Sequence, residues 1–272
     1  MTRATYIHGT DPDEQARLAQ LNALTNRAFL EFLNVPTGGL VLEVGSGLGI
    51  LAAAVQDAGA VVVGVEYAWP QLDGAKRRRH HSARAPHLVQ GDAHHLPVGE
   101  GLFDLVYARY VLEHVHDPAR VLAEMTRVVR PGGTVAVLEN DISLVRFDPP
   151  CPAFDRAWAA FGTLQRRLGG DGTIGRRLFR LLYGAGLTRV ELSFQPEAHW
   201  QGSPGFAPWV RNIIGNVESG RDALVESGLC TQALVDEAVA ELDALVARPD
   251  ASAGFVWNRA RGVRPPDAHT SG

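Results

Sequence analysis

Cysteine and lysine are scarce in this chain. Of its 272 residues two are cysteine, and Lys76 is the single lysine among 26 basic residues. Cys151 and Cys230 stand far apart without metal-like spacing, so we expect neither a disulfide framework nor a zinc site. No run of about 18 apolar residues occurs, and acidic residues stand where a signal peptide has its apolar core. We therefore expect a cytoplasmic protein with no membrane partner.

A strong excess of charge of one sign is also missing. The formal net charge is −4 and no long basic block occurs, so nothing indicates a nucleic-acid partner. A hydrophobic content of 46% is enough to build a full core in one large domain. Composition gives no indication of the oligomeric state.

Between residues 40 and 140, strand-like apolar runs alternate with helix-like segments. This alternation predicts an α/β fold, a doubly wound and mainly parallel sheet with helices on both faces. The candidate strands are 40–44, 61–65, 87–89, 103–108 and 133–139. The candidate helices are 49–58, 70–80, 110–114 and 118–129.

Helical patterns flank this alternating region. Asp11, Pro12 and Glu14 are typical of a helix start, and the apolar stripe that follows runs until Pro36. The later elements are helices at 153–168 and 174–186, a strand at 188–196, a helical region at 204–248 broken at Gly215, Gly220 and Gly228, and a last strand at 254–261.

The most informative stretch is 41–49, an apolar run that ends in three glycines at alternate positions. The apolar residues suit a strand that is covered on both faces. Gly45, Gly47 and Gly49 remove side chains where the backbone turns tightly or a ligand approaches closely. A helix that starts at Ile50 would direct its free N–H groups toward whatever lies over the glycines. This pattern predicts a nucleotide-binding turn.

Acidic residues follow the next two strands. Glu66 ends the second strand, where a carboxylate can accept hydrogen bonds from both hydroxyls of a ribose. Asp92 follows the third strand, where it can read an adenine amino group, although an Asx-type turn would also favour aspartate there. A nicotinamide dehydrogenase shares the glycine turn, but its fingerprint requires a glycine where this chain has Ile50.

Five segments in register resemble the class I, S-adenosylmethionine-dependent methyltransferases, in particular their bacterial small-molecule, natural-product-like branch. The segments are VLEVGSGLG, GVE, GDAHHLP, FDLVYARYVLEHV and RPGGTVAVLE. The resemblance implies a Rossmann-like, seven-stranded sheet whose last strand is antiparallel. It also implies methyl transfer from S-adenosylmethionine, which becomes S-adenosylhomocysteine, to an O, N or C acceptor on a small organic molecule such as a secondary metabolite.

The resemblance assigns the cofactor residues and the lid, whereas the acceptor residues, the helical insertion and the tail are expected from the composition and apolar spacing of the segments themselves. The expected parts are an N-terminal lid segment and helix at 1–36, a core at 37–200, a helical insertion over the substrate pocket at 201–253, a last core strand at 254–261 and a disordered tail at 262–272. The residues expected at the cofactor are Tyr6, Glu43, Gly45, Ser46, Gly47, Gly49, Glu66, Tyr67, Leu72, Asp92, Ala93, Arg109 and His114. The residues expected at the acceptor molecule are Tyr110, Asn140, Trp158, Trp200 and Trp209.

The general base is not fixed by any motif. Glu139 and His199 are candidates because each follows or ends a strand near the expected site. No metal is expected, because neighbouring histidines such as those at 94 and 95 point apart and no carboxylate cluster accompanies them. A nicotinamide-dependent oxidoreductase and a non-catalytic cofactor-binding module remain as alternatives.

Overall fold

The structure is a computed structural model that describes residues 25–78 and 85–267. Its centre is one sheet in the order β3-β2-β1-β4-β5-β8-β6, with β7 paired to β8. The strands of the first half are β1 (Leu40–Val44), β2 (Val61–Glu66), β3 (His87–Gln90), β4 (Phe103–Arg109) and β5 (Val129–Glu139). The pairings among these five strands are all parallel, as the alternating pattern predicts.

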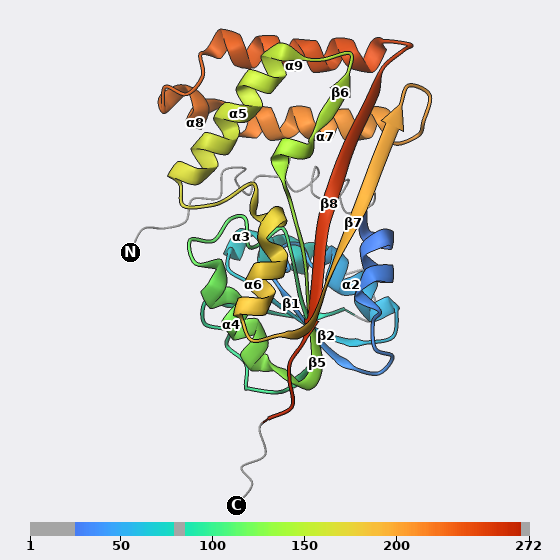
Figure 1. The fold of residues 1–272 in the computed structure, drawn as a ribbon, viewed down its shortest axis with the longest axis vertical. Coiled ribbons are helices and arrows are strands. Elements are labelled where there is room, and N and C mark those ends of the chain that lie inside the picture. The colour runs from blue at the N-terminus through green and yellow to red at the C-terminus, as the bar shows by residue number, and fades with distance from the viewer. Residues whose placement is uncertain (1–24, 79–84, 268–272) are drawn as a thin grey trace, which may run out of the picture.

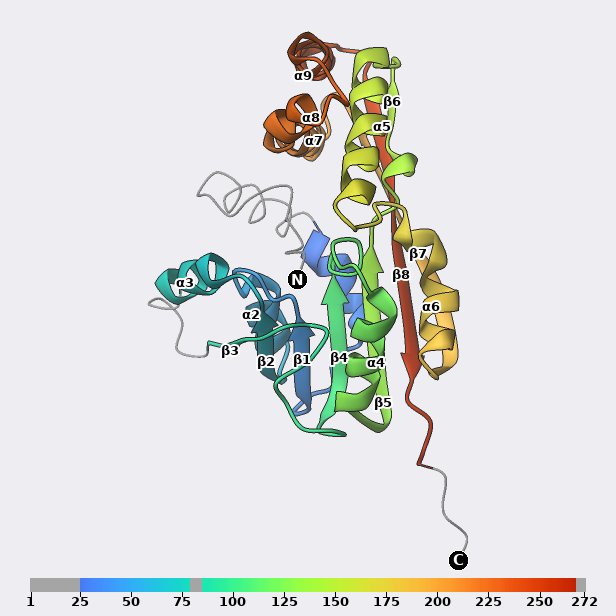
Figure 2. The same cartoon turned by 90° about the vertical axis from the view of Figure 1, so that its left-hand side faces the viewer.

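Helices cover both faces of this parallel half, as Figure 2 shows. Residues 25–33 are helical and pack with α2 (Ile50–Asp57) through Phe29, Leu51 and Val55 in one apolar cluster. The opposite face carries α4 (Pro118–Val128) and α6 (Leu178–Gly184), whose side chains share the other cluster with Leu42 and Val44. The helix α3 (Trp69–Arg78) follows β2. Alternate residues of β1 therefore enter different clusters, which explains why apolar residues occupy both of its faces, with Glu43 as the exception.

The last strands form a long antiparallel hairpin. They are β7 (Thr188–Trp200) and β8 (Ser252–Val263), and β8 also pairs antiparallel with β5 and with the short β6 (Arg146–Asp148). Because Glu139 at the end of β5 pairs with Asn258, the rest of β8 continues past the edge of the parallel sheet. At about 3.3 Å per residue, the six residues from 252 to 257 carry the hairpin roughly 20 Å farther. This projection is clear in Figure 1.

A helical layer packs on one face of the projecting hairpin (Figure 1). It consists of α5 (Pro152–Arg167), α7 (Phe206–Ser219), α8 (Arg221–Glu226) and α9 (Gln232–Ala247). The indole of Trp209 lies at its centre, 2% exposed, with ring centroids 5.7 Å from Phe147 and 6.4 Å from Phe255. Within the described ranges, no helix is long and apolar enough to cross a membrane.

Several expected boundaries are wrong. Gly215 does not break a helix but lies inside α7, and residues 110–114 form a turn rather than a helix. The sequence pattern missed β6, so the sheet has eight strands among the described residues instead of seven. The expected break at Gly220 lies between α7 and α8, and that at Gly228 precedes α9.

The expected tail at 262–272 begins too early, because residues 262 and 263 belong to β8. Arg264 follows them and donates hydrogen bonds to the carbonyl oxygens of Arg127 and Val129, both at 2.8 Å. Tyr6, the Asp11 helix start and the histidines at 80 and 81 lie outside the described residues.

Candidate cofactor and acceptor site

The glycine turn joins β1 to α2 at the carboxyl edge of the sheet, and three of its residues have left-handed backbones. Gly45, Gly47 and Gly49 have φ angles of 72°, 52° and 69°. A Cβ atom on Gly45 would collide with the side chain of Val111, whereas one on Gly47 would meet no atom within 4 Å. The turn is therefore tightly packed at its first glycine and open at its second.

Glu66, at the tip of β2, holds this turn in place. Its Oε2 accepts a hydrogen bond from the N–H of Gly47 at 2.8 Å, and its Oε1 accepts one from the N–H of Ala68 at 2.7 Å. Burial raises the pKa of Glu66, and these backbone donors oppose that rise. The carboxylate thus lies beside the open glycine, where the sequence predicts that it binds a ribose.

Glu43 is the most unusual group of the site. It is 4% exposed, stands opposite Tyr107 on β4, and its Oε2 has no hydrogen-bond partner. The hydroxyl of Ser46 is buried and unpartnered as well. Burial raises the pKa of Glu43 from 4.5 to about 8, against the opposing influence of the Arg109 guanidinium. Buried polar atoms usually have partners, so the free oxygen of Glu43 is available to a polar group of a ligand, whereas the Ser46 hydroxyl lies against Gly64.

The expected adenine residues lie near the ends of β2 and β3 with different exposures. Tyr67 is 62% exposed, whereas Leu72 is 4% exposed and packs in the interior. Asp92 Oδ1 accepts a hydrogen bond from the N–H of His94 at 2.8 Å, which is the geometry of an Asx-type turn. Ala93 packs against the apolar cluster under this turn.

The turn after β4 carries three expected residues, Arg109, Tyr110 and His114. Arg109 donates a hydrogen bond to Asn26 Oδ1 at 2.8 Å and so joins β4 to the helical segment 25–33. Tyr110 has a left-handed backbone with φ of 56°, and its hydroxyl is buried near Thr25 of the helical segment 25–33. His114 Nε2 lies 3.5 Å from an oxygen of Glu113.

Glu139 supports this turn from the end of β5. Its carboxylate accepts hydrogen bonds from the N–H groups of Val111, Leu112 and Glu113 at 3.0, 2.9 and 3.2 Å. The residue is fully buried, and burial together with the charge of Glu113 raises its pKa against those three donors. Asn140 donates to both oxygens of Glu113, at 2.8 and 3.0 Å. In this arrangement Glu139 and Asn140 position the turn.

The aromatic residues expected at the acceptor lie on the projecting hairpin and its helical layer. Trp158 stacks between Phe154 and Phe161 and donates from Nε1 to the carbonyl of Ile142 at 2.8 Å. Trp200 is 59% exposed at the end of β7, and Trp209 is buried in the helical layer. The structure therefore does not bring these three indoles together.

His199 lies on the hairpin beyond the sheet edge, and its side chain is 15% exposed. Nε2 is 3.3 Å from Glu197 Oε2, and a Cβ atom on Gly205 would lie 2.8 Å from Nδ1. The sequence analysis missed Glu197 and its neighbours Trp257 and Phe255 on the same face of the hairpin. The sequence does contain a signal for these residues. Polar residues occupy every second position of β7 from 193 to 199, and this face of the strand is half-buried in the structure. Polar residues are unusual on such a face.

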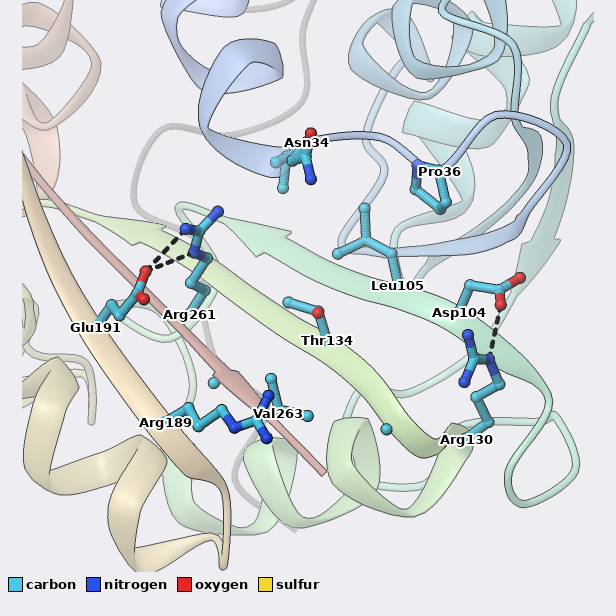
Figure 3. A pocket seen from close by; sticks show the side chains of 13 residues that line it. Asn34, Pro36, Asp104, Leu105, Arg130, Thr134, Arg189, Glu191, Arg261 and Val263 are labelled. Carbon is cyan, nitrogen blue, oxygen red and sulfur yellow. Dashed lines mark hydrogen bonds and ion pairs between the residues drawn. The ribbon is translucent and has the colours of Figure 1, made fainter. Parts of the chain in front are cut away.

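A separate cavity of about 440 Å³ lies at the opposite, amino edge of the sheet (Figure 3). Its lining includes Leu105 and Thr134, and two ion pairs border it, Arg130 with Asp104 at 2.7 Å and Arg261 with Glu191 at 2.8 Å. None of the residues expected at the cofactor lines this cavity. Among residues 25–78 and 85–267, no group of three or more His, Cys, Asp or Glu side chains could hold a metal ion.

Comparison with known proteins gives a consistent result. Residues 42–137 match a family described as a methyltransferase domain. An uncharacterized 37.1 kDa protein in a transposon of Streptomyces fradiae is 37% identical over 185 residues, which cover 64% of this chain and 52% of that protein. The demethylmenaquinone methyltransferase of Thermobifida fusca is 36% identical over 104 residues, 38% of this chain and 44% of the relative. The chain spans about half the length of these curated relatives.

A solved structure agrees on the fold. A phosphoethanolamine N-methyltransferase from Haemonchus contortus, in complex with S-adenosylmethionine, matches 89% of this chain and 52% of its own with a TM-score of 0.57 and 19% identity. The glycine turn and the acid at the tip of β2 lie within the matched residues 42–137. Residues 42–137 carry the match to a methyltransferase domain, and the sequence and fold comparisons together support the class I, S-adenosylmethionine-dependent family.

Proposed function

We propose that the protein transfers a methyl group from S-adenosylmethionine to an O, N or C acceptor on a small organic molecule, such as a secondary metabolite. The observation that carries the proposal is the unpartnered oxygen of Glu43 beside the open glycine turn. A buried carboxylate with a raised pKa and a free oxygen suits the ammonium group of the cofactor, which would supply the missing partner.

The other residues of the site fit the rest of that cofactor. Glu66 offers carboxylate oxygens at the position expected for the ribose hydroxyls, and Gly47 leaves room for close approach. Asp92 and the backbone of Ala93 would read the adenine edge. Tyr6 belongs to this proposal as part of a lid at 1–36, and the helical layer at 201–253 as the roof of the acceptor pocket.

S-Adenosylmethionine, when bound, supplies a methyl group on a positively charged sulfur, which is already electrophilic. The chain's own tasks are to hold the acceptor atom in line, to exclude water and to take up a proton where the acceptor loses one. Positioning alone can lower a barrier by about 7–11 kcal/mol. Proton transfer by a general base adds a factor of roughly 10²–10⁴ in rate. We assign these tasks to turn 110–114, which Glu139 supports, and to the hairpin face that carries Glu197.

Two further points support a small-molecule acceptor. The Thermobifida fusca relative is named for a small molecule, demethylmenaquinone. The chain also lacks the basic stripe expected of a nucleic-acid partner. We propose that the protein acts in the cytoplasm, without nucleic acid and without a metal. The family match disfavours the nicotinamide-dependent alternative.

A titration of the purified protein with S-adenosylhomocysteine and with NADH separates the two cofactors. We expect calorimetric binding of S-adenosylhomocysteine and none of NADH. Incubation with methyl-labelled S-adenosylmethionine and a panel of phenols, amines and carbon acids should then label a product. Binding of the cofactor without transfer to any acceptor would favour the non-catalytic module instead.

A further inference from the structure

The cavity at the amino edge of the sheet takes no part in the proposed reaction, and its lining includes three arginines. Its volume is about 440 Å³. The segment that holds Asn34 and Pro36 lines it on one side, and strands of the sheet line it on the other (Figure 3). Leu105, Thr134 and Val263 lie in register on three neighbouring strands of that wall. Cavities of this volume can hold a small molecule.

Two of the three arginines are held by carboxylates. Arg130 Nε donates to Asp104 Oδ1 at 2.7 Å, and the N–H of Leu40 donates to Asp104 Oδ2 at 2.8 Å. Arg261 Nε donates to Glu191 Oε2 at 2.9 Å, and Arg261 Nη2 lies 2.8 Å from the same oxygen. Each acid of the lining is therefore paired with one guanidinium, and one positive charge remains.

That charge belongs to Arg189 on β7. Its guanidinium forms no hydrogen bond or ion pair with any residue that the structure describes. The backbone of Arg189 is left-handed, with φ of 50°, where the pairing of β7 with β8 shifts register between Thr188 and Glu191. Left-handed backbones are uncommon for residues other than glycine, and irregular pairing of this kind re-aims a side chain. In Figure 3 the Arg189 side chain reaches from β7 toward Val263.

Two uncharged side chains of the lining are also available to a ligand. Within the described part of the chain, the Thr134 hydroxyl and the Asn34 carboxamide have no hydrogen-bond partner. Thr134 lies on β5, between the ion pairs formed by Arg130 and by Arg261 (Figure 3). Phosphate and carboxylate oxygens accept hydrogen bonds from all three kinds of group, and most strongly from a guanidinium. A ligand with several oxyanion groups can meet these donors one by one, so they need not converge on one atom.

We propose that this cavity binds a small polyanion, a molecule with two or more phosphate or carboxylate groups, and that Arg189 is its principal contact. Arg130 contributes its Nη2 group, which makes no hydrogen bond to the residues described. The Thr134 hydroxyl and the Asn34 carboxamide donate to the remaining oxygens. The site lies at the opposite edge of the sheet from the glycine turn, so it goes beyond the proposed function and does not depend on it.

Calorimetry of the full chain with sodium pyrophosphate and with sodium citrate tests the site. The ionic strength is matched in all titrations, because salt screens exposed charges. We expect binding of one molecule per chain, and the tighter of the two probes shows whether the natural ligand carries phosphate or carboxylate groups. Sodium phosphate, with a single oxyanion group, should bind about tenfold or more weakly, since it loses charge-assisted hydrogen bonds. Absence of binding by both pyrophosphate and citrate would overturn the proposal.

A second titration distinguishes this cavity from the proposed cofactor site. Saturation with S-adenosylhomocysteine should leave the affinity for the tighter probe unchanged, because none of the residues expected at the cofactor lines the cavity. Displacement of the probe by S-adenosylhomocysteine would place the anion at the glycine turn and overturn the proposal. Binding of the probe to a chain that does not bind S-adenosylhomocysteine would refute the cofactor assignment and leave this site standing.

Substitutions assign the binding to the named groups. Arg189→Gln should weaken binding of the tighter probe by about tenfold or more, as expected for the loss of hydrogen bonds from a charged group. Thr134→Val keeps the branched shape without the hydroxyl and should weaken it roughly three- to tenfold. Arg180→Gln removes the same charge from an exposed position on α6, outside the cavity, and should change nothing. Equal losses in Arg180→Gln and Arg189→Gln would mean attraction by net charge alone and would overturn the proposal.

Arg189→Gly separates binding from a role in the fold. Glycine adopts a φ of 50° without a steric cost, so Tm should equal or exceed that of the parent. Binding of the tighter probe should nevertheless fall as it does in Arg189→Gln. A variant with a lower Tm and unchanged binding would show that Arg189 serves the fold instead, and this result would contradict the proposed site.

Discussion

The carboxylate of Glu139 accepts a hydrogen bond from the backbone N–H of Leu112 at 2.9 Å, which joins the end of β5 to the turn after β4. Two further N–H groups of the same turn also donate to this carboxylate. The turn carries Tyr110 in a left-handed conformation, and an unsupported turn of that kind would be strained. Glu139 therefore fixes the position of a turn that we propose to lie between the cofactor and the acceptor.

The substitution Glu139→Gln tests this support. The glutamine keeps one side-chain oxygen, but its amide N–H₂ group can only donate and would face the backbone N–H donors of the turn. We therefore expect the free energy of unfolding to fall by about 2–4 kcal/mol. Urea unfolding measures the loss. Glu218→Gln, on the exposed side of α7, is the control and should change stability by less than about 0.5 kcal/mol. Equal stability of the two variants would contradict the role of Glu139.

Glu43 predicts a dependence of stability on pH. Its pKa is raised from 4.5 to about 8 in the folded protein, chiefly by burial. The folded state therefore holds a proton that the unfolded state has lost, and the contribution of Glu43 is full below pH 4.5 and disappears as the pH rises toward 8. The parent should lose stability relative to Glu43→Gln over this window, by up to about 1.4 kcal/mol per pH unit. Parallel urea-unfolding curves at pH 5, 6.5 and 8 would contradict the assignment.

The two glycines of the turn should respond differently to alanine. Gly47→Ala meets open space and should cost about 1–2 kcal/mol for its left-handed backbone. It should also weaken cofactor binding by about tenfold or more, since overpacking costs roughly 1–3 kcal/mol. Gly45→Ala should destabilise the fold further, because its Cβ collides with Val111. Gly184→Ala, at the end of α6 and with open space around it, is the control for both measurements.

Glu197 and His199 are distinguished by turnover with a phenolic acceptor. We expect Glu197 to accept the proton and His199 to orient the Glu197 carboxylate. Glu197→Gln should then lower kcat by about 10²-fold or more, which is the range of proton-transfer catalysis. His199→Ala should lower kcat by a smaller factor. Single-turnover rates at saturating cofactor provide the comparison. The reverse order, with His199→Ala the more damaging change, would make His199 the base.

The parallel half of the fold could be predicted from the sequence because its signals are local. Apolar runs, glycines and strand-end acids lie within a few residues of each other, and β1 agrees with its expected range. The turn at 110–114 could not be predicted from the sequence, because the Glu139 carboxylate that holds it is 26 to 28 residues away along the chain. Gly215 looked like a helix break, but the apolar stripe of Trp209, Ile213 and Val217 packs α7 and outweighs a glycine penalty of about 1 kcal/mol.

The residues proposed for the cofactor were easier to predict from the sequence than the residues proposed for the acceptor. Glu43, Gly47 and Glu66 lie at the ends of neighbouring parallel strands, so topology brings them together. The groups around Trp257 come from two strands of a hairpin that extends past the sheet edge and from a turn of β4. Their meeting depends on the length and pairing register of that hairpin, which no local pattern specifies.

Glu66 is the proposed ribose ligand beside the glycine turn, and the cofactor site depends on it most directly. Calorimetry with S-adenosylhomocysteine and with its 2′-deoxy analogue, on the parent and on Glu66→Ala, measures this contact. We predict that the parent prefers the natural compound and that Glu66→Ala weakens its binding by about tenfold or more while removing the preference, as expected for a charged hydrogen-bond pair. Unchanged affinity in the variant, or a parent that binds neither compound, would contradict the assignment of the cofactor to this edge of the sheet.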